Sequence, residues 1–120
     1  MVKTVTASRP TARVSLKDSN TIFKRIRNKP VKKVKNLLND LISQKRNIEG
    51  RYFTKASKEI LDLIESTEKS AEAQGLDTEK LFIKEAVANK SFRFYLPKSR
   101  WTHRGRRAKI CQLKITLEER

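Results

Sequence analysis

The chain has 120 residues and a formal net charge of +16, from 29 Lys and Arg against 13 Asp and Glu. This length fits one small domain with a modest core, and the excess positive charge favours a polyanionic partner, of which nucleic acid is the commonest. The single cysteine, Cys111, excludes a disulfide within the chain and fits a reducing, cytoplasmic location. No apolar run approaches the roughly 20 residues that span a bilayer, so we expect no membrane partner.

The charge is distributed unevenly. Residues 1–55 carry a net charge of +12, residues 56–89 carry −4, and residues 90–120 carry +8. This pattern predicts a folded body with an acidic side facing water and two basic segments facing RNA or DNA.

The first predicted elements are a strand and a helix. Val2 to Ala7 alternates apolar and polar residues, which indicates a possible short edge strand inside a basic N-terminal segment, residues 1–11. Ser15, followed three residues later by Asp18, resembles a capping box. A helix should therefore run from there to about Asn28.

Two further helices follow. Pro30 suits the first turn of a second helix, whose apolar stripe recurs at spacings of three and four from Val31 to Ile42. After a loop at residues 44–50, Thr54 can cap a third helix, residues 55–74, which Gly75 would end. The outer face of this helix carries Glu59, Asp62, Glu65, Glu68 and Glu72.

Two strands complete the predicted body. Residues 81–87 place Leu81, Ile83 and Val87 on one side, and residues 110–117 place Cys111, Leu113, Ile115 and Leu117 on one side. The predicted fold is α+β: three helices packed on a small antiparallel sheet, with a long projecting basic β-hairpin. We expect a single domain with a globular body (12–89 and 110–120) and a hairpin (90–109) that reaches roughly 35 Å at ~3.3 Å per residue.

The hairpin segment, residues 90–109, is called the basic arm here. It contains eight Lys or Arg residues, four aromatic residues and no Asp or Glu. Trp101 beside Arg100 offers a stacking surface for bases and cations for phosphates, although it could instead be a core residue. Phe92 and Phe94 share a strand face that could pack on the body, with Arg93 and Tyr95 turned to the partner. Packing on the body and contact with the partner have equal weight for these two phenylalanines.

Nothing in the sequence indicates an enzyme. His103 lies among arginines that disfavour a metal ion and an imidazolium, so it is better suited to contacting a base. One Cys and one His cannot supply a four-ligand zinc site, and the isolated glycines form no phosphate-cradling loop. The carboxylates of the third helix are best explained as a solvated face. We therefore predict no catalytic residue, no metal and no cofactor.

Folded RNA is favoured over duplex DNA as the partner, because no predicted helix has a base-reading face and an aromatic arm suits unstacked bases. A general nucleic-acid-binding or DNA-compacting protein is the alternative function. A protein-docking module that uses the acidic face of the third helix is a second alternative, compatible with the first.

Several motifs, in this order and spacing, resemble one ribosomal protein family. They are A-R-V-S-L-K at 12–17, I-R-N-K-P-V at 26–31, G-R-Y-F-T-K-A-S-K-E-I-L at 50–61, A-E-A-Q-G-L-D-T-E-K-L at 71–81 and L-P-K-S-R at 96–100. The chain is similar over residues 12–119 to the large-subunit ribosomal protein numbered twenty-two in bacteria and seventeen in eukaryotes. The helix-three motif resembles the archaeal and eukaryotic form of the family.

The resemblance implies a structural constituent of the large ribosomal subunit. The body would sit near the mouth of the peptide exit tunnel, and the tip of the basic arm, residues 98–104, would line the tunnel and meet the nascent peptide. Large-subunit ribosomal RNA and neighbouring large-subunit ribosomal proteins would be the partners, with no homo-oligomer. The predicted RNA-binding residues are Lys90, Arg93, Lys98, Arg100, Trp101, His103, Arg104, Arg106, Arg107 and Lys109, together with Arg9, Arg13 and Lys17 near the N-terminus.

The chain departs from the family pattern at two places. Trp101 and Thr102 stand where the family usually has Gly-Arg, which affects the backbone path of the tip. The loop before the third helix is shortened at residues 45–49. These features indicate an archaeal-type member.

Overall fold

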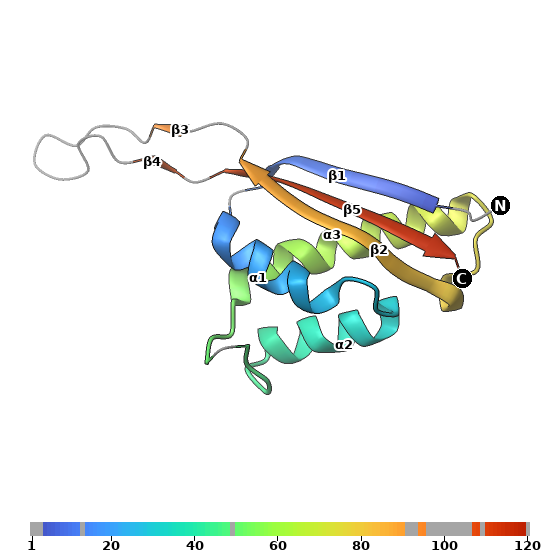
Figure 1. The fold of residues 1–120 in the computed structure, drawn as a ribbon, viewed down its shortest axis with the longest axis horizontal. Coiled ribbons are helices and arrows are strands. Elements are labelled where there is room, and N and C mark those ends of the chain that lie inside the picture. Colours follow the sequence, from blue (N-terminus) through green and yellow to red (C-terminus); the bar gives the residue numbers. More distant parts are fainter. Residues whose placement is uncertain are drawn as a thin grey trace, which may run out of the picture.

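The computed structural model describes residues 4–12, 14–48, 50–90, 94–95, 107–108 and 110–119. Strands β1 (Thr4–Ala12), β2 (Leu81–Lys90) and β5 (Cys111–Glu119) form an antiparallel sheet in the order β1–β5–β2 (Figure 1). Helices α1 (Leu16–Ile26), α2 (Val31–Ile42) and α3 (Thr54–Ala73) lie on one side of this sheet, and the 3₁₀ turn η1 (Thr78–Lys80) precedes β2. The predicted α+β fold of three helices on a small antiparallel sheet is confirmed.

The core lies between the sheet and the helices. The inward residues of β5 are the four that alternation predicted, Cys111, Leu113, Ile115 and Leu117, each at most 2% exposed. The helices cover them with fully buried side chains that include Ile22, Phe23, Ile26, Leu38, Leu41, Ile60 and Ile64. Burying each such side chain contributes about 1.5–3 kcal/mol, so this interface holds the body together.

Strand β1 is longer than the predicted edge strand at residues 2–7. It pairs antiparallel with β5 from Thr4 opposite Glu118 to Ala12 opposite Cys111, with a register shift after Arg9. Pro10 lies in this strand and has no backbone N–H to donate, which an edge position and the register shift after Arg9 tolerate. From Thr4 onward, the basic N-terminal segment therefore forms part of the sheet.

Strand β2 contains a register shift between Ile83 and Glu85. The shift reverses the alternation, so that Ala86 and Ala88 are buried while Val87 lies opposite Lys114 on the outer face. The prediction that Val87 shares a face with Leu81 and Ile83 is wrong for this reason. The alternation of a regular strand assigns every second residue to the same face, so it cannot predict an extra residue in one strand.

Two helix ends carry the capping residues that the sequence predicted, Ser15 before α1 and Gly75 after α3. The Ser15 side chain accepts a hydrogen bond from the Asp18 backbone N–H at 3.4 Å, as predicted for the start of α1. At the end of α3, the N–H of Leu76 bonds to the Ala71 carbonyl, and Gly75 adopts φ +83°, which is a Schellman ending.

The start of α3 corrects the sequence-based expectation. Thr54 is the first helical residue rather than the cap, and the cap position is held by Phe53 in the left-handed region at φ 47°, ψ 42°. Phe53 has no side-chain oxygen that could cap the helix, but its ring packs against the core. Phe53 thus occupies the cap position without a capping hydrogen bond from its side chain, while its ring contacts the core.

The turn between α1 and α2 covers the outer edge of β2. The N–H of Asn28 donates to the Ile83 carbonyl at 2.8 Å, and the N–H of Ile83 donates to the Lys29 carbonyl at 3.1 Å. The Arg27 guanidinium donates from Nε and NH2 to the Ala86 carbonyl, at 3.1 and 2.9 Å. This turn satisfies backbone groups that an open sheet edge would leave exposed for pairing with other chains.

Two short strands lie beyond the end of the sheet where β2 stops and β5 begins (Figure 1). Strands β3 (Phe94–Tyr95) and β4 (Arg107–Ala108) pair antiparallel, with Phe94 opposite Ala108 and Tyr95 opposite Arg107. Apart from Lys90, which ends β2, the remaining residues of the basic arm, including its predicted tip, lie outside the described residues.

Candidate RNA-binding surface

The predicted RNA-binding residues divide into three groups in the structure. Arg9, Lys17 and Lys90 are fully described, and Arg107 is described in its backbone as part of β4. The others lie outside the described residues: Arg13, Arg93, Lys98, Arg100, Trp101, His103, Arg104, Arg106 and Lys109. Their contact with RNA stays a prediction.

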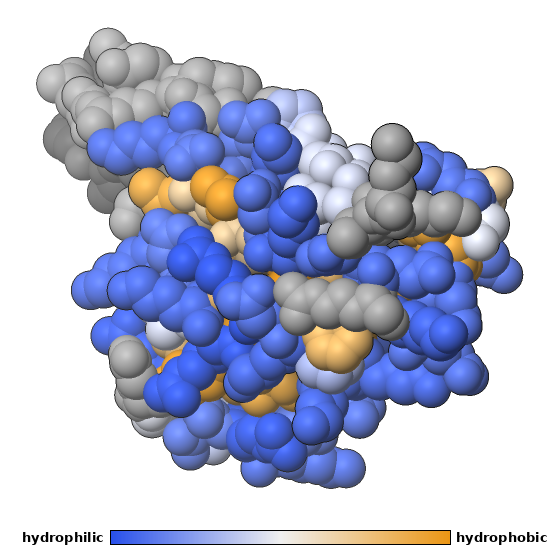
Figure 2. Space-filling view, turned by 45° about the vertical axis from the view of Figure 1, so that its right-hand side comes forward, coloured by the Kyte–Doolittle hydropathy of each residue, from blue (hydrophilic) through white to orange (hydrophobic). Residues whose placement is uncertain are grey.

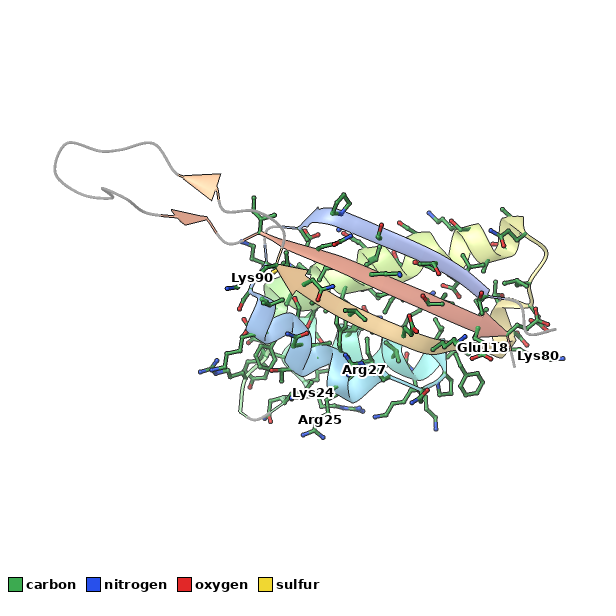
Figure 3. All side chains as sticks on the ribbon, turned by 45° about the horizontal axis from the view of Figure 1, so that its top comes forward. Lys24, Arg25, Arg27, Lys80, Lys90 and Glu118 are labelled. Atoms are coloured by element: carbon green, nitrogen blue, oxygen red, sulfur yellow. The ribbon has the colours of Figure 1, made fainter. Side chains whose placement is uncertain are left out.

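Lys17 and Lys90 are both exposed. Lys17 lies in the first turn of α1, and Lys90 is the last residue of β2, opposite Cys111. Figure 3 shows Lys90 at the end of the sheet from which the chain continues toward β3. Lys90 thus extends the charge of the basic arm onto the body.

Arg9 has a different environment from the one expected of an RNA-binding residue. Its guanidinium forms an ion pair with Glu59 of α3, and the two side chains are 33% and 36% exposed. The pair links the edge strand to the helix beneath it and offsets much of the local charge of Arg9. A role for Arg9 in RNA binding remains a prediction, and it would require Arg9 to share its guanidinium between Glu59 and a phosphate.

A group of cations that the sequence analysis did not select lies on α1 and in the turn that follows it. We call Lys17, Lys24, Arg25 and Arg27 the α1 basic surface. All four are exposed, and in the described part of the chain none of them forms an ion pair with a carboxylate. Figure 3 shows Lys24 and Arg25 on the helical side of the molecule, near Arg27.

The spacing of this surface follows from the helix period. Lys24 and Arg25 lie seven and eight residues after Lys17, which places all three on one side of α1. The buried residues of this helix are Ser19, Ile22, Phe23 and Ile26. The same periodicity that predicts the buried stripe of α1 also places these cations on the exposed side of the helix.

The acidic face of α3 is only partly solvated. Glu59 binds Arg9, and Glu68 forms an ion pair with Lys35 of α2. Asp62, Glu65 and Glu72 are exposed, as expected. Two of the five carboxylates therefore fasten neighbouring elements to α3, and the other three form the water-facing part.

The described surface is suited to a charged partner. Figure 2 shows a face that is hydrophilic over most of the described residues, with small apolar areas between them. Within the described ranges there is no group of three or more His, Cys, Asp or Glu residues placed to hold a metal ion. None of the helices in those ranges has the length and apolarity needed to cross a membrane. Cys111 is buried in the core, where its Sγ donates to the Val14 carbonyl at 3.0 Å.

The fold and the charges together define a small, strongly basic α+β protein with a cationic surface on its body. The chain belongs to the ribosomal protein L22p/L17e family, whose sequence model matches residues 7–118. The archaeal-type membership that the motifs predicted is confirmed by the relatives that follow.

Three archaeal proteins illustrate the similarity. A protein of Thermoplasma volcanium named large ribosomal subunit protein uL22 is 34% identical over 106 residues, covering 73% of this chain and 72% of the relative. The uL22 protein of Thermoplasma acidophilum is 33% identical over 106 residues, covering 73% of this chain and 70% of the relative. The uL22 protein of Methanopyrus kandleri is 28% identical over 130 residues, covering 90% and 82%.

Proposed function

We propose that this protein is a structural constituent of the large ribosomal subunit and binds large-subunit ribosomal RNA in the cytoplasmic ribosome. The observation that carries the proposal is the family match over residues 7–118, which includes the body and the basic arm. The net charge of +16 supports it, because a protein that neutralises many phosphates needs such an excess of cations. The protein would act by holding RNA in shape, and no reaction is assigned to it.

The proposed interface has two parts. The basic arm would contact RNA through Lys90, Arg93, Lys98, Arg100, Trp101, His103, Arg104, Arg106, Arg107 and Lys109. The body would contribute Lys17 and the rest of the α1 basic surface, whose cations are exposed and have no carboxylate partner among the described residues. Arg9 and Arg13 would add to the contact near the N-terminus.

The tip of the basic arm, residues 98–104, is proposed to line the peptide exit tunnel and to meet the nascent peptide. Trp101 stacked on a base would contribute about 1–3 kcal/mol to the contact. Trp101→Ala should then weaken incorporation into large subunits while leaving the urea unfolding of the free protein unchanged. Normal incorporation together with a less stable free protein would place Trp101 in the core instead.

A competition gel shift separates this function from that of a general nucleic-acid-binding or DNA-compacting protein. The protein is bound to a labelled fragment of large-subunit RNA at moderate salt and challenged with unlabelled RNA or duplex DNA of equal phosphate content. Ribosomal RNA should compete far better than the duplex. Equal competition by the two would support the DNA-compacting alternative.

A further inference from the structure

A pocket of about 430 Å³ lies beside α2, between the turn that precedes this helix and the turn that follows it. Lys29 and Pro30 line it from the turn before α2, and Lys33, Val34, Asn36 and Leu37 line it from the helix. Arg46 lines it from the turn after α2. Asn36 and Leu37 lie three and four residues after Lys33, so these three share one side of the helix, and Val34 lies three residues before Leu37.

The cations around this pocket are held in place by the fold. The Lys29 carbonyl accepts the backbone N–H of Ile83, which fixes the turn against β2. Arg46 folds back along α2, because the Asp40 carbonyl accepts the backbone N–H groups of Lys45 and Arg46 and the Asp40 carboxylate lies 3.3 Å from the Arg46 NH2. The fold thereby fixes the backbone that carries Lys29 and Arg46, which line the pocket together with Lys33.

The charge of the pocket is largely uncompensated. Lys29 and Lys33 are exposed, and neither forms an ion pair within the described ranges. Asp40 pairs with Arg46 but does not line the pocket. Cations that converge without a carboxylate repel one another, and an anion bound between them removes that repulsion.

The lining also includes apolar side chains. Pro30 and Leu37 are half-buried, and Val34 is 1% exposed. Asn36 is exposed, and its side-chain amide can both donate and accept hydrogen bonds. A bare phosphate needs the cations alone, whereas a nucleotide also uses an apolar surface for its base and an amide for the base edge.

We propose that this pocket binds one unstacked nucleotide of the large-subunit RNA, an inference that rests on the proposed function. The phosphate lies between Lys29, Lys33 and Arg46, and the base lies over Pro30 and Leu37 within reach of Asn36. The body thereby anchors RNA at a second point, separate from the basic arm. A protein carboxylate is the competing occupant, and the experiments below distinguish it.

The first experiment titrates the purified full chain with adenosine monophosphate and follows backbone and side-chain amides by NMR. Saturable shifts confined to residues 29–37 and Arg46 are expected, with weaker responses to inorganic phosphate or adenosine given separately. The double variant K29Q/K33Q should weaken the binding of the nucleotide about tenfold, since it removes two charge-assisted contacts. The matched control K58Q/K69Q removes two exposed lysines of α3 and should leave the affinity unchanged.

Three results of this titration would overturn the proposal. The first is a set of shifts spread over all basic surfaces without saturation, and the second is an equal loss of affinity in the control variant. The third is an equal response to inorganic phosphate and to the nucleotide, since the apolar lining residues would then have no part in binding.

The second experiment places a photo-crosslinking residue, Asn39→p-benzoylphenylalanine, one turn beyond Asn36 on exposed helix surface that does not line the pocket. In assembled large subunits the cross-link should form to ribosomal RNA. A cross-link to a neighbouring protein would overturn the proposal in favour of a protein carboxylate. If the chain did not enter large subunits at all, the proposed function would fail. The nucleotide titration would still show whether the pocket binds a nucleotide.

Discussion

The guanidinium of Arg27 donates two hydrogen bonds to the backbone carbonyl of Ala86, from Nε at 3.1 Å and from NH2 at 2.9 Å. Arg27 ends α1, and Ala86 lies just after the register shift in β2. The contact therefore joins the first helix to the strand at the point where the sheet edge departs from regular pairing. It also fixes the turn that carries Lys29 to the pocket on α2.

Replacing Arg27 should destabilise the body. We expect Arg27→Gln to lower the free energy of unfolding by about 1–2 kcal/mol, because the Ala86 carbonyl loses two charge-assisted donors. Urea unfolding followed by circular dichroism measures the change. Arg25→Gln, which removes a neighbouring exposed arginine, serves as the control and should stay within about 0.5 kcal/mol of the parent protein. Equal effects of the two substitutions would refute a structural role specific to Arg27.

The left-handed conformation of Phe53 makes a second prediction about stability. Both Phe53→Ala and Phe53→Gly lose the packing of the ring against the core, but only alanine keeps a Cβ at φ 47°. The alanine variant should therefore be about 1 kcal/mol less stable than the glycine variant. Thermal and urea unfolding of the pair gives the difference directly. A glycine variant less stable than the alanine variant would show that the conformation carries no strain.

The hydroxyl of Ser57 is buried within α3 and has no hydrogen-bond partner among the described residues. Leaving a buried hydroxyl without a partner costs about 1–3 kcal/mol in an apolar surrounding, and alanine is also the better helix former. Ser57→Ala should therefore leave stability unchanged or raise it by up to about 1 kcal/mol. Ser70→Ala is a useful comparison, because the Ser70 hydroxyl is exposed and donates to the Ser66 carbonyl. A marked loss of stability in Ser57→Ala would mean that a water molecule or another group satisfies that hydroxyl.

The α1 basic surface predicts a salt-dependent contribution to RNA binding. The variant K24Q/R25Q should reduce the slope of log K against log salt concentration by about 0.7–0.9 for each phosphate contact that is lost. Its unfolding free energy should not change, since both side chains are exposed on the face of α1 opposite the core. Filter binding of a large-subunit RNA fragment at several salt concentrations gives the slope. The α3 variant K58Q/K69Q controls for the loss of net charge, and an equal reduction in that variant would argue against a specific role for α1.

The helices and the inward face of β5 could be predicted from sequence because their burial follows a single period. Ser15 at the start of α1 and Gly75 after α3 mark their helix ends by local chemistry, and both predictions hold in the structure. Val87 could not be placed correctly, because a register shift in β2 depends on pairing with a strand that lies far along the chain. Phe53 holds the cap position predicted for Thr54, and its packing against the core is a tertiary contact that no local capping pattern reveals.

The candidate RNA-binding surface was also only partly predictable from the sequence. Composition alone identified the basic arm, whose residues lie mostly outside the described ranges. The ion pair of Arg9 with Glu59 depends on a contact between residues 50 positions apart, which no local pattern reveals. The pocket on α2 likewise needs Arg46 to fold back beside Lys33, and that proximity exists only in three dimensions. Local periodicity therefore predicts which side chains are exposed, whereas tertiary contacts determine which charges are already paired.

Membership of the large ribosomal subunit can be tested by sucrose-gradient sedimentation of extracts from cells that produce the protein with an affinity tag. The tagged chain should sediment with large ribosomal subunits and assembled ribosomes, and it should remain with them through a wash in moderate salt. Recovery of the chain in the light fractions, or with genomic DNA while the large subunits lack it, would contradict the central claim.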